Sequence, residues 1–210
     1  MSDKKKVIGI INYGTNNIFS LLNALNFIGF NSKIINHYSD FGKIDCLILP
    51  GVGAFPKAMK EIVNKDYHKA IGEFNLGKKK IIGICLGFQM LFDFSEEFTH
   101  TNGLGLIKGY VTPFSGKNLS IPLISWLKTK CNKNILDKKN LSEFLNNQYF
   151  YYIHSYYAQV ADKTKIMCFS ENNNFIFSSG IFNDNIIGVQ FHPEKSGYNG
   201  LKFLESLINV

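Results

Sequence analysis

The 210-residue sequence contains no arginine, so all 23 of its basic residues are lysines. The planar guanidinium of arginine is the group that grips phosphates and guanine edges in a bidentate way. A formal net charge of +7 would otherwise suit a nucleic-acid partner, because bound cations release counterions from the phosphate backbone. Short lysine runs at 4–6 and 78–80 lie beside predicted strands, where solvated edge residues are common. We therefore expect no nucleic-acid partner.

Cysteine is scarce and shows no metal-binding pattern. The sequence has four cysteines (Cys46, Cys85, Cys131 and Cys168) without Cys-x-x-Cys spacing or an accompanying histidine cluster. We expect no metal, no cofactor and no disulfide framework. No apolar run reaches the roughly 18 residues of a membrane span, and the run after the basic N-terminus covers only about five. These absences predict a cytoplasmic protein with reduced thiols and no membrane association.

The remaining composition is that of an ordinary globular protein. Hydrophobic residues make up 45% of the sequence and charged residues 19%, and we find no internal repeat or low-complexity tract. A chain of this length buries roughly 70% of the surface that its unfolded form exposes. We therefore expect residues 1–210 to form one domain.

Strand and helix patterns alternate through the first half. Short β-branched runs at 7–11, 32–36, 46–50 and 80–84 predict strands. Asn17 is a candidate cap for a helix that Gly29 ends, and a helical region runs from 55 to 74 with a weak point near Lys65. This alternation is typical of βαβ units and a parallel sheet.

The second half has a different texture. After residue 103 most segments resemble strands separated by turns, with a short helical stretch near Leu141 and a last helix at 200–208. The predicted fold class is therefore α/β, with an open, mostly parallel central sheet flanked by helices and an antiparallel extension.

The segment Gly83-Ile84-Cys85-Leu86-Gly87 places a potential nucleophile between a predicted strand and an apolar run that is predicted to be a helix. A nucleophile elbow needs small residues on both sides because the turn is tight and strained. Free N–H groups at the start of a helix can lower the pKa of a thiol and stabilise an oxyanion. The alternative is a cysteine buried in the core, which is the commoner fate of cysteine on an apolar strand.

A candidate base lies more than one hundred residues downstream. In GVQFHPEKSG (188–197), His192 and Glu194 are two residues apart, and we expect Pro193 to keep the chain extended so that both side chains point to one side. A carboxylate on one ring nitrogen would fix the tautomer of a general base. Taken alone, His192 could equally be a loop histidine with a structural role.

Pro50-Gly51-Val52-Gly53-Ala54 follows a predicted strand directly. Two glycines there allow close approach of the backbone to a ligand, with N–H groups directed at developing negative charge. A phosphate loop is the alternative, but the Walker spacing and the third glycine of the dinucleotide fingerprint are absent. We favour an oxyanion-binding strand.

Together these segments resemble those of the class I glutamine amidotransferases, and the resemblance extends over nearly the whole chain. The stretch YYIHSYY (151–157) is most similar to the glutaminase subunits of imidazole glycerol phosphate synthases. The resemblance implies a single glutaminase domain over 1–210. It also implies hydrolysis of L-glutamine to glutamate, with ammonia channelled to a (β/α)8 cyclase in histidine biosynthesis.

The resemblance also implies roles for individual residues. Cys85 would be the nucleophile, His192 the acid and base, and Glu194 the residue that orients His192. The oxyanion would be bound around Gly51, Val52, Gly53 and Leu86, and the amino-acid end of the substrate by Gln89, Ser155 and Tyr156. The partner interface would include Asn12, Trp126 and Lys195.

Two segments depart from the family pattern. Residues 121–127 retain only the Pro and Trp of the Pro-His-x-Gly-Trp-Asn motif near the docking face, and the loop at 12–17 differs from Asp-Tyr-Gly-x-Gly-Asn. The identity of the partner is therefore open, and a sugar amidotransferase that amidinates a bacterial surface sugar is the alternative. Two other classes of protein are also compatible with the sequence. One is a related α/β cysteine peptidase or redox chaperone, and the other is a non-catalytic binding module.

Overall fold

The computed structural model describes residues 6–14, 18–115, 119–132 and 141–210. The predicted helix cap Asn17 lies outside the described residues. The elements of the first half are β1 (Val7–Ile11), α1 (Ile18–Phe27), β2 (Asn31–Ile35), η1 (Tyr38–Lys43), β3 (Cys46–Leu49), α2 (Phe55–Asn64), α3 (Tyr67–Leu76), β4 (Lys80–Ile84) and α4 (Leu86–Gln89). The predicted weak point near Lys65 is the break between α2 and α3.

The second half is mostly strands, as predicted. Its elements are β5 (Phe94–Ser95), β6 (Thr101–Asn102), β7 (Gly109–Pro113), β8 (Leu123–Cys131), α6 (Ser142–Leu145), β9 (Tyr149–His154), β10 (Tyr156–Val160), η2 (Lys163–Lys165), β11 (Ile166–Asn172), β12 (Phe175–Asn183), β13 (Ile186–Val189), η3 (Pro193–Lys195) and α7 (Gly197–Asn209).

One sheet joins both halves. Its central strands follow the order β2-β1-β3-β4-β13 and are parallel, and β12, β10 and β7 continue it in antiparallel pairs. Strands β11, β8 and β9 branch from β12. The predicted α/β fold with an antiparallel extension is confirmed. The last strand of the chain, β13, lies beside β4 with Val189 opposite Ile84, which brings the segment around residue 192 next to the segment around residue 85.

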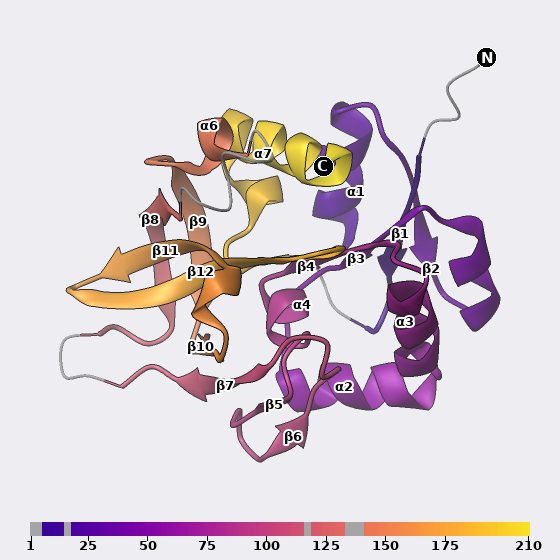
Figure 1. The fold of residues 1–210 in the computed structure, drawn as a ribbon, viewed down its shortest axis with the longest axis horizontal. Helices are drawn as coiled ribbons and strands as arrows, with labels where there is room; N and C mark the ends of the chain where they lie inside the picture. Colours follow the sequence, from indigo (N-terminus) through magenta and orange to yellow (C-terminus); the bar gives the residue numbers. More distant parts are fainter. Residues whose placement is uncertain (1–5, 15–17, 116–118, 133–140) are drawn as a thin grey trace.

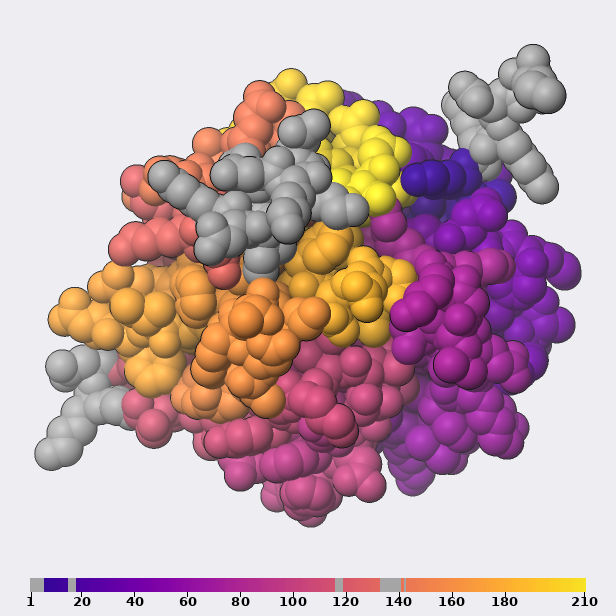
Figure 2. All heavy atoms as spheres, in the orientation of Figure 1, coloured from indigo at the N-terminus to yellow at the C-terminus, as the bar shows by residue number. Residues whose placement is uncertain are grey.

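Helices cover both faces of the parallel strands (Figure 1). Alternation along each strand divides the apolar side chains between two cores. On the face of α1 and α7, Ile10, Ile48 and Ile82 pack together, whereas Leu47 and Ile81 pack on the face of α2 and α3. In the space-filling view, the indigo and purple N-terminal part and the orange and yellow C-terminal part form one continuous body (Figure 2). Within the described ranges, no helix is long and apolar enough to cross a membrane.

Helix α4 is shorter than the apolar run 86–92 predicts. It ends at Gln89 because the chain from 104 to 107 returns along the next residues and donates backbone hydrogen bonds to them. The carbonyl groups of Met90, Leu91 and Phe92 accept these bonds, and they are therefore not available to continue the helix.

Candidate active site

The carboxyl ends of the central parallel strands carry most of the predicted site. Asn12 follows β1, Gly51 lies two residues after β3, Cys85 follows β4, and Gln190 follows β13. Because these strands are parallel, their ends meet at one edge of the sheet, which is the usual ligand-binding edge of open α/β folds.

Cys85 occupies a strained elbow between β4 and α4. Its φ of 51° and ψ of −105° are unusual for a residue with a side chain. Both flanking glycines are required by close packing: a Cβ atom on Gly83 would come within 2.7 Å of the Gly87 carbonyl oxygen, and one on Gly87 would overlap the carbonyl group of Leu49. The predicted elbow is therefore present. Cys85 is also buried, with 5% of its surface exposed, as the alternative of a core cysteine expects, but its backbone is that of the elbow and not of a strand.

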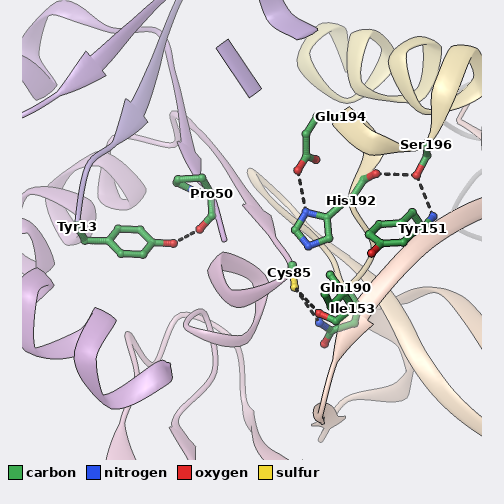
Figure 3. Close-up of polar contacts among 9 residues, drawn as sticks. All are labelled: Tyr13, Pro50, Cys85, Tyr151, Ile153, Gln190, His192, Glu194 and Ser196. Atoms are coloured by element: carbon green, nitrogen blue, oxygen red, sulfur yellow. Dashed lines mark hydrogen bonds and ion pairs between the residues drawn. The ribbon is translucent and has the colours of Figure 1, made fainter. Parts of the chain in front are cut away.

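The Nδ1 atom of His192 lies 2.7 Å from Oε1 of Glu194, and both side chains are almost completely buried (Figure 3). The other ring nitrogen, Nε2, is on the side of Cys85. The expectation that the chain stays extended through Pro193 is wrong: residues Pro193–Lys195 form a 3-10 turn. This turn brings the carboxylate back to the ring. Proline is well suited to the first position of the turn, because its missing N–H group would have no partner there.

Two further contacts fix the backbone of His192. Its N–H group donates to the carbonyl oxygen of Tyr151 in β9, at 2.9 Å. The hydroxyl of Ser196 donates to the carbonyl oxygen of His192 and accepts a bond from the N–H of Tyr151, at 2.6 and 3.0 Å (Figure 3). Ser196, which the sequence interpretation missed, thus ties the turn to β9.

The electrostatic surroundings of His192 favour its protonated form. Burial alone lowers the pKa of the ring. The nearby charge of Cys85, followed by the contact with Glu194, outweighs burial and raises the pKa of His192. A protonated imidazole beside a cysteine is the arrangement expected of a cysteine nucleophile with its base.

A cavity of about 270 Å³ opens at Cys85. Every residue predicted to bind the oxyanion or the substrate lines it: Gly51, Val52, Gly53, Leu86, Gln89, Ser155 and Tyr156. A Cβ atom on Gly51 would meet the backbone nitrogens of Leu86 and Gly87, so the glycine-rich loop lies directly against the elbow. The structure brings the elbow and the glycine-rich loop together in one cavity, whereas His192 is fully buried and does not line it.

Glu97 also lines this cavity, and the sequence interpretation missed it. Its Oε2 accepts a bond of 2.9 Å from the N–H of Phe55, and burial raises the pKa of its carboxyl group although that bond opposes the shift. Glu96 and Glu97 stand side by side in the sequence without a recognisable motif, so only the fold distinguishes the cavity residue from its neighbour.

The three residues predicted to contact a partner lie around the same edge. Trp126 is 50% exposed in β8 and faces Tyr151 across the strand pair, with ring centroids 6.0 Å apart. Lys195 is exposed in the turn after His192. The side-chain amide of half-buried Asn12 donates to Asn36, at 3.0 Å. Their role in partner binding stays a prediction.

A family model for glutamine amidotransferase class-I matches residues 9–207. The chain belongs to this family. Relatives of this amidotransferase include the imidazole glycerol phosphate synthase subunit HisH of Listeria monocytogenes serovar 1/2a, 39% identical over 206 residues, with 97% of this chain and 96% of the relative covered. The HisH subunit of Sulfurimonas denitrificans is 40% identical over 205 residues, covering 95% and 96%.

Solved structures show the same fold. The amidotransferase superposes on the structure of PurLQS from Thermotoga maritima with a TM-score of 0.77 at 19% identity, covering 98% of both chains. A second structure, described as a glutamine amidotransferase, gives a TM-score of 0.74 at 14% identity and covers 95% of this chain and 98% of its own. The resemblance predicted from the motifs is confirmed, and family membership favours amidotransferase chemistry over a peptidase or a redox chaperone.

Proposed function

We propose that this amidotransferase hydrolyses L-glutamine to glutamate with Cys85 as nucleophile and delivers the ammonia to a synthase partner. The observation that carries the proposal is the buried His192–Glu194 pair, which lies next to Cys85 at the elbow; Cys85 in turn lines the cavity. A non-catalytic binding module would have no need of a strained cysteine beside a buried imidazole held by a carboxylate.

The chemistry follows from this arrangement. The sulfur of Cys85 attacks the carbon of the substrate carboxamide, and the resulting oxyanion is held by backbone N–H groups of the Gly51–Gly53 loop and of Leu86. His192 gives its proton to the nitrogen as the C–N bond breaks, so ammonia leaves and a glutamyl thioester remains. Water then attacks the thioester while His192 takes its proton. Glutamate is released, and the thiol is restored.

Charge complementarity supports glutamine as the substrate. The half-buried carboxylate of Glu97 is placed to bind the α-ammonium group of an amino acid, while Ser155 and Tyr156 lie at the cavity wall with polar groups for its other end. Gln89 uses its side-chain nitrogen within the protein, which leaves Oε1 to accept a bond from the ligand.

For the partner, we propose a (β/α)8 cyclase of histidine biosynthesis. The HisH relatives support this choice, since they are named as subunits of imidazole glycerol phosphate synthase and match over nearly their whole length. An enzyme whose thiol must stay reduced suits the cytoplasm, where we place it.

An apolar face beside the cavity supports a docked partner. Ile124, Trp126 and Tyr149 are each at least half exposed on strands β8 and β9. Opposite Ile124 in the strand pair is Ile153, which also lines the cavity. A partner seated on this face, with Asn12 and Lys195 at its margin, would cover the exit for ammonia. Exposed aromatic side chains are enriched in interfaces of this kind.

Co-purification with a barrel cyclase tests the proposal. We expect a complex that turns over the ribonucleotide substrate of the cyclase with glutamine, and a Cys85→Ala complex that does so only with added ammonium. Trp126→Lys should weaken the complex. Leu76→Lys is the matched control, because Leu76 is 81% exposed at the end of α3 that precedes β4. Failure of every condition to give a complex would refute this partner.

The second candidate partner is a sugar amidotransferase. The divergent segment 121–127 favours it, since this segment leads into the exposed face of β8. A complex with such an enzyme, and none with the cyclase, would decide for this alternative while leaving the glutaminase chemistry in place.

A further inference from the structure

A chain of polar groups leads from Tyr156 and Gln89, which line the cavity, through Gln190 to the sulfur of Cys85. Gln190 is fully buried directly after β13, with its backbone N–H bonded to Ser179 at 2.9 Å. Its side-chain Nε2 lies 3.7 Å from Cys85 Sγ (Figure 3). Because Ile84 and Val189 are opposite each other in neighbouring parallel strands, Cys85 and Gln190 leave the sheet side by side.

The direction of the Gln190 amide follows from its neighbours. Tyr156 offers a carbonyl oxygen, which can only accept, so the group of Gln89 that lies 2.9 Å away must be its NH₂. The same NH₂ lies 3.0 Å from Gln190, which must therefore present its oxygen there. The remaining NH₂ of Gln190 is then directed at the sulfur. The carbonyl oxygen of Tyr156 also lies 2.8 Å from Nδ1 of His154. Because a carbonyl oxygen can only accept, this ring nitrogen must be the one that carries the proton.

We propose that Gln190 is a further residue of the reaction site, whose amide N–H donates to the sulfur of Cys85 and stabilises its anionic form. Gln89 is the positioning residue that holds the Gln190 amide in this direction. The inference rests on the proposed role of Cys85 as nucleophile.

The surroundings of the sulfur fit this role. The carbonyl oxygen of Ile153 lies 3.8 Å from Sγ and can accept the proton of the neutral thiol, whereas the Gln190 amide can only donate to the sulfur. Loss of the thiol proton therefore removes the bond to Ile153 and strengthens the bond from Gln190, because hydrogen bonds to charged groups are roughly twice as strong as neutral ones. Gln190 and His192 are alternate residues of one segment, so a single stretch of chain supplies both the donor and the base.

The test is the rate of Cys85 alkylation by iodoacetamide as a function of pH, followed by peptide mass spectrometry in the full chain. Gln190→Met keeps the unbranched shape and removes the donor. Gln190→Glu keeps an acceptor for Gln89 and adds a like charge beside the sulfur. We expect the alkylation profile to move to higher pH by about one unit in the Met variant, with about a tenfold slower rate at neutral pH, and further in the Glu variant.

Thermal unfolding of each variant separates this role from a purely structural one. A structural role predicts lower stability with an unchanged alkylation profile, and a profile in Gln190→Met that superposes on the wild-type profile would overturn the proposal. If neither Gln190 variant folds, Gln89→Met removes the orienting bond and should produce a smaller shift in the same direction; an unchanged profile there would also refute it. Alkylation needs no glutamine turnover, so wild-type protein that shows the expected profile but releases no glutamate would refute the proposed function and not the role of Gln190.

Discussion

His192 and Glu194 form a buried pair, with Nδ1 and Oε1 2.7 Å apart and side-chain exposures of 0% and 3%. In the proposed mechanism, the carboxylate fixes the proton on Nδ1, and Nε2 exchanges a proton with the sulfur and the leaving group. Glu194→Gln retains the size of the side chain but loses the charge that favours an imidazolium. We expect kcat for glutamine hydrolysis to fall by at least about 100-fold. Ammonia-dependent turnover by the partner should be unaffected, and wild-type kcat would contradict the assigned role.

Glu97 is expected to govern the affinity for glutamine. Removal of its charge in Glu97→Gln weakens the contact with the α-ammonium group, so KM should rise about tenfold or more while kcat changes little. Glu96→Gln is the matched control, since Glu96 is exposed and accepts a bond from Thr112 at 2.6 Å instead of lining the cavity. Steady-state kinetics measures both, and equal KM values in the two variants would exclude this function for Glu97.

The elbow depends on the absence of a side chain at residue 87. In Gly87→Ala the new methyl group would overlap the carbonyl group of Leu49, and we expect the free energy of unfolding to fall by about 2–3 kcal/mol. Gly72→Ala places the same methyl group in helix α3 with no atom within 4 Å. That control should be neutral or more stable by up to about 1 kcal/mol. Denaturant titrations that gave similar values for both variants would contradict the packing described for the elbow.

His154 makes the fold sensitive to acid. Burial lowers the pKa of its ring to about 4, against the opposing effect of the bond to Tyr156. In the unfolded state the ring binds a proton near pH 6.5. The contribution of neutral His154 to the free energy of unfolding is therefore fully present above that pH and is lost as the pH falls toward 4. The difference between the two pKa values corresponds to a loss of about 3 kcal/mol in the free energy of unfolding. His154→Phe retains a ring among Phe114, Tyr152 and Phe177, and should weaken this pH dependence. Identical pH slopes in both proteins would show that another group is responsible.

The sequence predicts the elbow, the glycine-rich loop and the His192–Glu194 contact well because each one depends on local chemistry. The glycines around Cys85 and around Val52 indicate backbone positions that only glycine can occupy. The two-residue spacing of His192 and Glu194 indicates a contact between their side chains. These are properties of short segments, and they remain visible without any knowledge of the fold.

Residues whose roles depend on neighbours distant in sequence could not be predicted in this way. Gln190 meets Cys85 only because β13 inserts beside β4, and Glu97 differs from Glu96 only in the direction set by the loop after α4. The turn at Pro193 was misjudged for a related reason, since proline is compatible with both an extended chain and the start of a 3-10 turn. The length of α4 is likewise set by the returning chain at 104–107.

Covalent labelling with a diazo-ketone analogue of glutamine tests the central claim most directly. We predict that peptide mass spectrometry finds the label on Cys85 and on none of the other three cysteines, that L-glutamine protects against it, and that Cys85→Ala neither takes up the label nor releases glutamate. Glutamate release by Cys85→Ala at the wild-type rate, or a label carried by another residue, would contradict the account.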